Sequence, residues 1–231
     1  MRPGRTRIPD DKALPQIERL LDGDAVAPVL ERMLGDDAGI SSVRVAYVRY
    51  RPAKRLLVVY ELECGGTAAS VVAQANSGGR DLAERATRPA SVALVARVSG
   101  RTPAATPLAY DTGLEALFQW PPLDLGLPAL AETPERLRRE LVDAGLELER
   151  ADDLPRLVKH RHAQRAVLRL DGHIAKVYRN EEALAEAVAA LAAAEALPVR
   201  TARREAVVPE LRITVQSLVP GGPPAGVLQA A

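Results

Sequence analysis

The chain has 231 residues, of which 47% are hydrophobic, and this is enough apolar material for one or two folded domains. Basic and acidic residues nearly balance to a net charge of +1, so there is no excess of positive charge for a nucleic-acid surface. A single cysteine excludes an internal disulfide and a cysteine-based metal site. No apolar stretch reaches the roughly 18 residues of a membrane span, and no apolar leader follows Met1. We therefore expect a cytoplasmic protein that binds neither nucleic acid nor membrane.

The first forty residues are expected to be helical, because apolar residues recur at three- and four-residue spacing over 14–21 and 25–34. Gly35 is placed to end the second of these helices. Three strands separated by turn-like residues should follow, over 43–50, 56–62 and 69–75.

The middle of the chain has weaker signals. A run of small and apolar residues predicts a strand over 91–98, and the proline-rich region 100–128 is expected to be irregular. Phe118 and Trp120 lie within this region, where we expect them to fill a small core rather than to form a ligand platform.

A second series of elements begins with a helix over 134–144, for which Thr133 is the predicted N-cap and Gly145 the predicted end. Asp171-Gly172 is typical of a two-residue hairpin turn. Strands are expected before and after this turn, over 156–161, 166–170 and 173–178. The series is completed by an alanine-rich helix and two short strands, over 181–196, 205–208 and 211–218.

The two halves of the chain contain an internal repeat. Residues 48–58 align without a gap with residues 158–168, and both segments contain the pattern Val-x-x-Arg-x-Ala-x-Arg. Each segment opens a strand–turn–strand–turn–strand unit, and the third strand carries Gln74 in the first copy where the second copy carries Lys176. We interpret the repeat as a duplication.

Lysine is scarce, and arginine supplies most of the positive charge. The lysines are Lys12, Lys54, Lys159 and Lys176. A GC-rich coding sequence favours arginine in this way without any functional cause. A lysine that is kept against such a bias indicates a position where a compact ammonium group is needed.

The segments after residue 160 follow a recognisable order. An arginine-rich hairpin leads to a third strand, Ile-Ala-Lys-Val-Tyr-Arg, at 174–179, and the next helix carries Glu186 followed by alanines and a leucine. Leu197-Pro198-Val199 and the segment 214–221, which ends in Pro-Gly, come next. This order resembles the aminoglycoside-phosphotransferase-like (phosphotransferase enzyme) family, whose N-terminal lobe has the fold of a protein kinase.

The resemblance covers residues 154–222 well and 43–150 loosely, and it implies a nucleotide site. Lys176 would hold the phosphates of ATP, and Glu186, or else Glu182, would be its carboxylate partner.

The segment from Gln216 to Val219 would be the hinge that contacts adenine through backbone groups. The residues implied at the cofactor site are Lys176, Glu186, Gln216, Leu218 and Val219. The implied cofactor is ATP with Mg²⁺, and the implied acceptor is a small hydroxylated or aminated molecule.

The sequence departs from the family in two ways. The first hairpin turn, residues 162–165, has no glycine to let backbone N–H groups approach phosphates. No aspartate follows Asp171 and no asparagine follows Asn180, so the catalytic base and the Mg²⁺ ligands of phosphoryl transfer are missing from this chain. We therefore expect it to be inactive alone and to be the front part of an ATP-dependent small-molecule phosphotransferase of the aminoglycoside/choline-kinase type, without the C-terminal lobe. The alternative is a complete, non-catalytic regulatory module that binds a nucleotide or a partner.

The expected fold is α+β, with two tandem modules that each combine an antiparallel sheet with helices. The second module would be the kinase-like N-lobe, and the first a degenerate copy of it or a cap. The expected divisions are a helical segment over 1–40, a first module over 41–150, a second module over 151–222 and a flexible tail over 223–231.

Three alternative sites have weaker support. His160, His162 and His173 belong to one predicted hairpin and could form a three-histidine zinc site. The two arginine-rich hairpins could bind phosphate groups or RNA, although aromatic residues for base stacking are nearly absent from them. Cys64 has no histidine nearby in sequence to activate it, so we expect no catalytic role for it.

Overall fold

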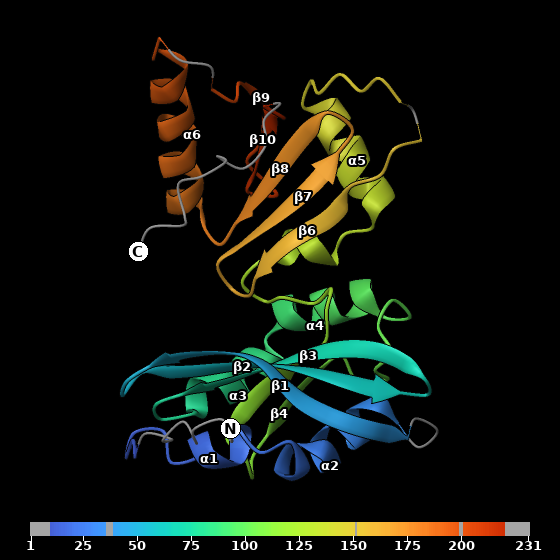
Figure 1. Ribbon diagram of the computed structural model, residues 1–231, viewed down its shortest axis with the longest axis vertical. Helices are drawn as coiled ribbons and strands as arrows, with labels where there is room; N and C mark the ends of the chain where they lie inside the picture. Colours follow the sequence, from blue (N-terminus) through green and yellow to red (C-terminus); the bar gives the residue numbers. More distant parts are fainter. Residues whose placement is uncertain (1–9, 36–38, 151, 199–200, 220–231) are drawn as a thin grey trace, which may run out of the picture. The chain divides into compact units, whose positions relative to one another are not determined.

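The computed structural model in Figure 1 describes residues 10–35, 39–150, 152–198 and 201–219. The chain folds as two compact units, Met1–Ala131 and Glu132–Ala231. Each unit is α+β and contains a five-stranded antiparallel sheet. In both sheets the first three strands lie side by side in sequence order, and the fifth strand lies between the third and the fourth. The expected α+β class with two antiparallel sheets is confirmed.

The first sheet consists of three long strands and two short ones. They are β1 (Ile40–Arg51), β2 (Arg55–Cys64), β3 (Thr67–Asn76), β4 (Leu108–Asp111) and β5 (Ala116–Gln119). The helices of this unit are α1 (Ile17–Leu20), α2 (Gly23–Leu34), α3 (Arg80–Thr87), α4 (Pro89–Val98) and the 3-10 helix η1 (Pro128–Ala131). Because α1 and α2 precede the sheet while α3 and α4 connect β3 to β4, each pair is free to cover a different face.

Helices cover both faces of the first sheet. Alternate residues of β2, from Leu56 to Cys64, pack against α1 and α2 in the larger core, which also contains Phe118 and Trp120. The opposite face packs against α3 and α4 through a smaller core that includes Leu117. Figure 1 shows α2 and α4 on opposite sides of this sheet. The expected burial of the phenylalanine and the tryptophan is confirmed.

Tyr60 ties the first sheet to α1 inside the larger core. Its hydroxyl donates to the carbonyl oxygen of Leu20 at 2.5 Å, and the tyrosine is fully buried. This carbonyl belongs to the last turn of a short helix, where the carbonyl groups have no N–H donor within the helix. Burial also raises the pKa of Tyr60, so the hydroxyl keeps its proton and remains a donor at neutral pH.

We expect Tyr60→Phe to lower the free energy of unfolding by about 1–2 kcal/mol, because the Leu20 carbonyl would stay buried without its donor. Urea unfolding followed by circular dichroism would measure the difference. Tyr47→Phe is the matched control, since Tyr47 is exposed and should change the stability by less than about 0.5 kcal/mol. Equal losses in the two variants would contradict the assignment.

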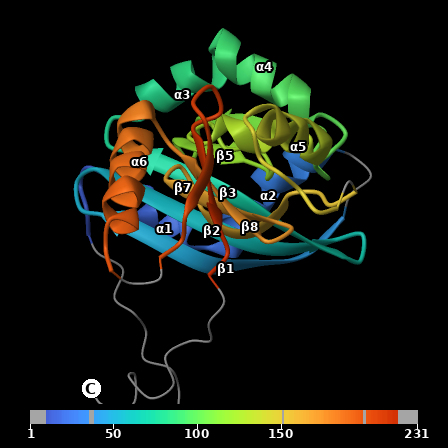
Figure 2. The same cartoon turned by 90° about the horizontal axis from the view of Figure 1, so that it is seen from above.

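The second sheet has shorter strands, and its unit contains two helices among the described residues. Its strands are β6 (Arg156–Arg161), β7 (Arg165–Leu170), β8 (His173–Tyr178), β9 (Arg204–Val208) and β10 (Ile213–Ser217). The helices are α5 (Pro134–Asp143), before β6, and α6 (Glu181–Glu195), between β8 and β9. In Figures 1 and 2, α5 and α6 flank this sheet from opposite sides.

One face of the second sheet is apolar. Its buried residues alternate along the strands and meet in register, and they are Ala166, Leu168, Ala175, Val177, Ala206, Val208, Ile213 and Val215. Leu137 and Leu141 are the buried residues of α5, which contacts β9. The other helix, α6, contacts β8 and β10 but buries only Leu184 among its described residues. The face opposite the apolar one is therefore only partly covered.

The two units correspond beyond their strand order. The first hairpin turns at Ala53 in one unit and at Ala163 in the other, and both alanines have a positive φ of 54°. The helix that precedes each sheet stops at a glycine with positive φ, Gly35 at 94° and Gly145 at 92°. The repeating unit is thus a helix, three strands, a helical connection and two strands.

Most of the elements expected from the sequence are present, and the predicted caps are confirmed. The Thr133 side chain accepts a hydrogen bond from the backbone N–H of Arg136 at the start of α5. Asp171 takes the positive φ expected of its hairpin turn, at 48°.

Two expectations for the middle of the chain are wrong. Residues 91–98 belong to α4 and not to a strand, and the buried residues Ser91, Leu94 and Val98 have helical spacing. The region 100–128 contains β4 and β5 instead of being irregular throughout, and no helix was expected where α3 lies.

The two units divide between residues 131 and 132, so α5 lies in the second unit, whereas we expected it in the first module. The expected tail over 223–231 lies outside the described residues. Among the helices of the described ranges, none is both long enough and apolar enough to cross a membrane.

Candidate functional site

Lys176 lies in the middle of β8, a central strand of the second sheet. Its register partners are Val167 on β7 and Thr214 on β10. Directly opposed residues of neighbouring strands project from the same face, and so do residues two apart on one strand. The residues of this face, which we call the lysine face, are Lys159 and Arg161 on β6, Arg165, Val167 and Arg169 on β7, Ile174, Lys176 and Tyr178 on β8, and Thr214 and Gln216 on β10.

The packing of β8 fixes the direction in which Lys176 points. Ala175 and Val177 are fully buried on the opposite, apolar face. A one-residue slip of the strand would carry these residues into solvent and the lysine into the core. On the lysine face, the hydroxyl groups of Tyr178 and Thr214 lie 3.3 Å apart and join β8 to β10.

The ammonium group of Lys176 is half-buried and has no acidic partner in the described part of the chain. Its Nζ donates a hydrogen bond to Oε1 of Gln216 at 2.8 Å. Burial lowers the pKa of Lys176, and the positive charge of Arg165 lowers it further. A partly desolvated cation that faces a second cation is stabilised by a bound anion. The lysine face can therefore bind a phosphate or a carboxylate group.

The carboxylate partner implied by the family resemblance is not in contact with Lys176. Glu186 and Glu182 are both exposed on α6, and within the described residues neither forms an ion pair with the lysine. The side chain of Asn180 caps this helix by accepting a hydrogen bond from the backbone N–H of Ala183. A Lys176–Glu186 pair stays a prediction.

The residues of the expected hinge lie at the end of β10 and beyond it. The backbone of Gln216 is paired with β8 and β9, and its side chain contacts Lys176. The backbone N–H of Leu218 donates to the carbonyl oxygen of Gly172 at 2.8 Å. The side chains of Leu218 and Val219 are exposed. Sequence reasoning assigned Gln216 a backbone role and did not foresee that its side chain would orient the lysine.

The first sheet has a glutamine at the position of Lys176. Gln74 lies opposite Leu57 on β2, just as Lys176 lies opposite Val167 on β7. Gln74 is only 1% exposed, and its Nε2 donates to Oδ1 of Asn76 at 3.1 Å. The same oxygen accepts from Nε of Arg55 at 3.2 Å. This position in the first unit is therefore uncharged, closed to solvent and engaged with neighbouring side chains.

The three histidines do not converge on one metal position. His160 lies opposite Ala166, at the beginning of β7, and the rings of His160 and His162 have their centroids 5.5 Å apart. His173 lies opposite Leu170, at the other end of β7. Four residues of strand separate these ends by about 13 Å, far beyond the reach of zinc ligands at about 2 Å. The three-histidine alternative is wrong.

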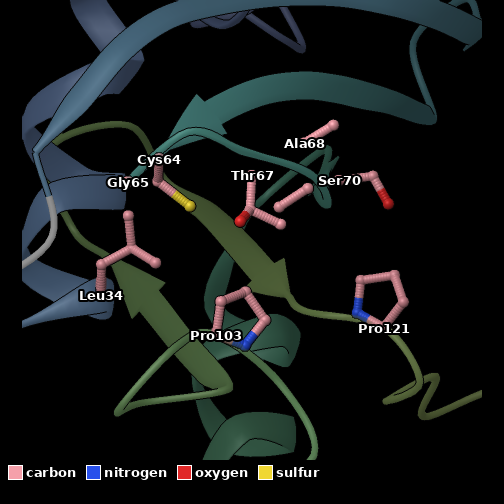
Figure 3. Close-up of a pocket in the computed structure, with 9 residues that line it drawn as sticks. Leu34, Cys64, Gly65, Thr67, Ala68, Ser70, Pro103 and Pro121 are labelled. Carbon is pink, nitrogen blue, oxygen red and sulfur yellow. The ribbon is translucent and has the colours of Figure 1, made fainter.

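A separate pocket of about 460 Å³ lies in the first unit beside the β2–β3 hairpin. In Figure 3, Cys64 and Thr67 lie along one side of it, and Pro103 and Pro121 lie across from them. Ser70 adds a second hydroxyl group to the lining, and no carboxylate, imidazole or ammonium group is among the residues described there. The pocket has room for a small apolar molecule but offers no acid–base pair for catalysis.

Comparisons of the chain with protein-family models, with curated proteins and with solved structures found no match. The resemblance to phosphotransferases therefore depends on the residues of the second unit and on their order.

We expect the pKa of Lys176 to lie below the ordinary range of a lysine, because burial and Arg165 disfavour its protonated form. NMR of ¹³C-dimethylated lysines across alkaline pH would follow this titration, and Lys176→Arg would identify the Lys176 signal. A nucleotide bound at the lysine face should move the Lys176 titration to higher pH, since an anion favours the ammonium form. A Lys176 titration in the ordinary range of a lysine would contradict the described burial.

Proposed function

We propose that this chain is the N-terminal part of an ATP-dependent small-molecule phosphotransferase, and that its second unit is the nucleotide-binding lobe. In this proposal Lys176 neutralises charge on the phosphates of the nucleotide. The catalytic base and the Mg²⁺ ligands would come from a C-terminal lobe outside these 231 residues. The acceptor would be a small hydroxylated or aminated molecule.

The observation that carries the proposal is the half-buried, acid-free environment of Lys176 on a central strand. A lysine with only a structural role would be expected to stay exposed. Burying an ammonium group costs free energy unless a nearby anion compensates for the lost hydration. Gln216 holds the ammonium in place at 2.8 Å, and Arg165 adds a second positive charge at the same face. Two cations suit a polyphosphate better than a single carboxylate.

The sequence of elements supports the same assignment. The order β6, β7, β8, α6, β9, β10 is the order of a kinase-like N-terminal lobe, with the lysine on the third strand. Leu184 is the one buried residue described in α6, and Glu186 lies about 200° around the helix from it. A Lys176–Glu186 pair would therefore require this helix to rotate as well as to approach the sheet when a nucleotide binds.

A non-catalytic nucleotide-binding or partner-binding regulatory module is the second candidate. The hairpin turn at 162–164 favours it, because Ala163 occupies the left-handed conformation without being a glycine. The Cβ of this alanine limits how closely the backbone can approach a phosphate group. Tight binding of nucleotide would then depend on side chains alone.

Titration of the chain with magnesium-ATP by calorimetry tests nucleotide binding. We expect Lys176→Ala to weaken binding by at least about tenfold, which corresponds to the loss of one charge-assisted contact. The matched control is Lys54→Ala, which removes an exposed lysine from the β1–β2 turn of the first unit and should leave the affinity unchanged. Glu186→Gln should weaken binding less than Lys176→Ala.

The outcomes separate the two candidates. If Lys176→Ala loses binding and the control does not, the second unit is a nucleotide-binding lobe, whether in an enzyme or in a regulatory module. Equal binding by all variants would contradict a nucleotide-binding lobe. Translation of the downstream DNA in every frame then distinguishes the enzyme from the module. A phosphotransferase requires a segment of the form His-x-Asp-x-x-x-x-Asn there, and its absence leaves the regulatory module.

A further inference from the structure

A groove in the first unit runs along α4 and has a volume of about 640 Å³. Its walls come from the end of α3, from α4 and from the segment that leads to η1. The lining residues are Arg85, Arg88, Ala90, Ser91, Ala93, Leu94, Arg97, Leu125 and Pro128. Its size falls in the range of about 300–1,000 Å³ that is usual for small-molecule sites.

The charged groups that line this groove are all arginines, since no acidic residue is among the described residues of its walls. Within the described chain, the guanidinium groups of Arg85 and Arg88 form neither an ion pair nor a hydrogen bond. Arginines elsewhere on the same unit do form ion pairs, for example Arg32 with Asp111 at 2.6 Å. The groove thus concentrates positive charge that its own walls do not neutralise.

The N-terminus of α4 adds to this positive potential. Arg88 occupies the N-cap position, its side chain caps no N–H group, and the first turn of the helix contains no acidic residue. An N-cap usually supplies an oxygen that accepts from the first turn, and a positive charge at this end opposes the helix dipole. Pro89 has no N–H, and that of Ser91 already donates to the carbonyl oxygen of Arg88. An anion beside Arg88 would offset its charge and accept from the N–H of Ala90.

Arg85, in the last turn of α3, is partly shielded from water. Burial lowers the pKa of its guanidinium, and so do the positive charges of Arg55 and Arg88, while Asp124 and Asp81 act in the other direction. These carboxylates lie outside the groove lining. A further negative charge inside the groove would stabilise the protonated guanidinium.

We propose that this groove binds a small phosphate ester, with the phosphate between Arg85 and Arg88 at the start of α4 and the organic part against Leu94, Leu125 and Pro128. Guanidinium groups form paired hydrogen bonds to phosphate oxygens, and the apolar floor suits a ring or a short alkyl chain. The lining has no aromatic residue on which bases could stack, which favours a small molecule over a single-stranded nucleic acid. The site is independent of the lysine face and of the function proposed for it.

Phenyl phosphate and inorganic phosphate are suitable probes, with binding followed by ¹⁵N NMR at the amides of Ala90 and Ser91 in the full chain. We expect both to bind and phenyl phosphate to bind more tightly. Arg88→Gln and Arg85→Gln should each weaken phenyl phosphate by about tenfold, as expected for one lost charge-assisted contact. The matched control is Arg44→Gln, which removes an exposed arginine from β1 and should have no effect.

Lys176→Ala separates this site from the nucleotide lobe, because it should leave phenyl phosphate binding at the α4 amides unchanged. Unaltered affinity in both Arg85→Gln and Arg88→Gln would overturn the proposal. Binding of a single-stranded oligonucleotide through the same arginines, with no shift on adding phenyl phosphate, would also overturn it. Thermal unfolding of each variant confirms that it is folded, and Arg88 is exposed, so its replacement should be tolerated.

Discussion

Both units depend on the alternation of side chains along their strands. In each sheet one set of alternate residues is apolar and buried. In the first unit this set, which includes Leu56, packs against the helices that precede the sheet, and in the second unit the preceding helix α5 contacts β9. Burial of this apolar set is the main source of stability. It also fixes the strand register, because a one-residue slip would expose the apolar residues to water. The other set of alternate residues faces the helices of the connection between the third and fourth strands. Lys176 belongs to this second set.

The length of that connection distinguishes the two units. In the first unit it contains α3 and α4, which cover the sheet and leave Gln74 only 1% exposed. In the second unit it contains α6 alone, and the lysine remains accessible. An uncharged amide suits a closed position, because burying a charge without a partner is costly. The exchange of glutamine for lysine therefore matches the difference in covering helices.

The sequence predicted what depends on local patterns. The hairpins, the Thr133 cap and the stop at Gly145 follow from alternation and from backbone conformation at single residues. Residues 91–98 were misassigned because small apolar residues fit both periods, and only tertiary packing selected the helical one. The scarcity of lysine and the repeat singled out Lys176, but its contact with Gln216 depends on the pairing of β8 with β10, which is nonlocal. The groove beside Arg85 and Arg88 was not predicted, because it forms only where α3 and α4 meet Leu125 and Pro128, which are distant in sequence.

The shared register gives this chain an internal reference. Each position of the second sheet has a counterpart in the first that experiences the same temperature, pH and salt in the same sample. Val167 and Leu57 occupy equivalent places opposite Lys176 and Gln74. A spectroscopic change common to both places reports on solvent or on general loosening of β-structure, whereas a change at Val167 alone reports on the charge beside it. The two corresponding sheets thus allow the contribution of one ammonium group to be read as a difference within a single molecule.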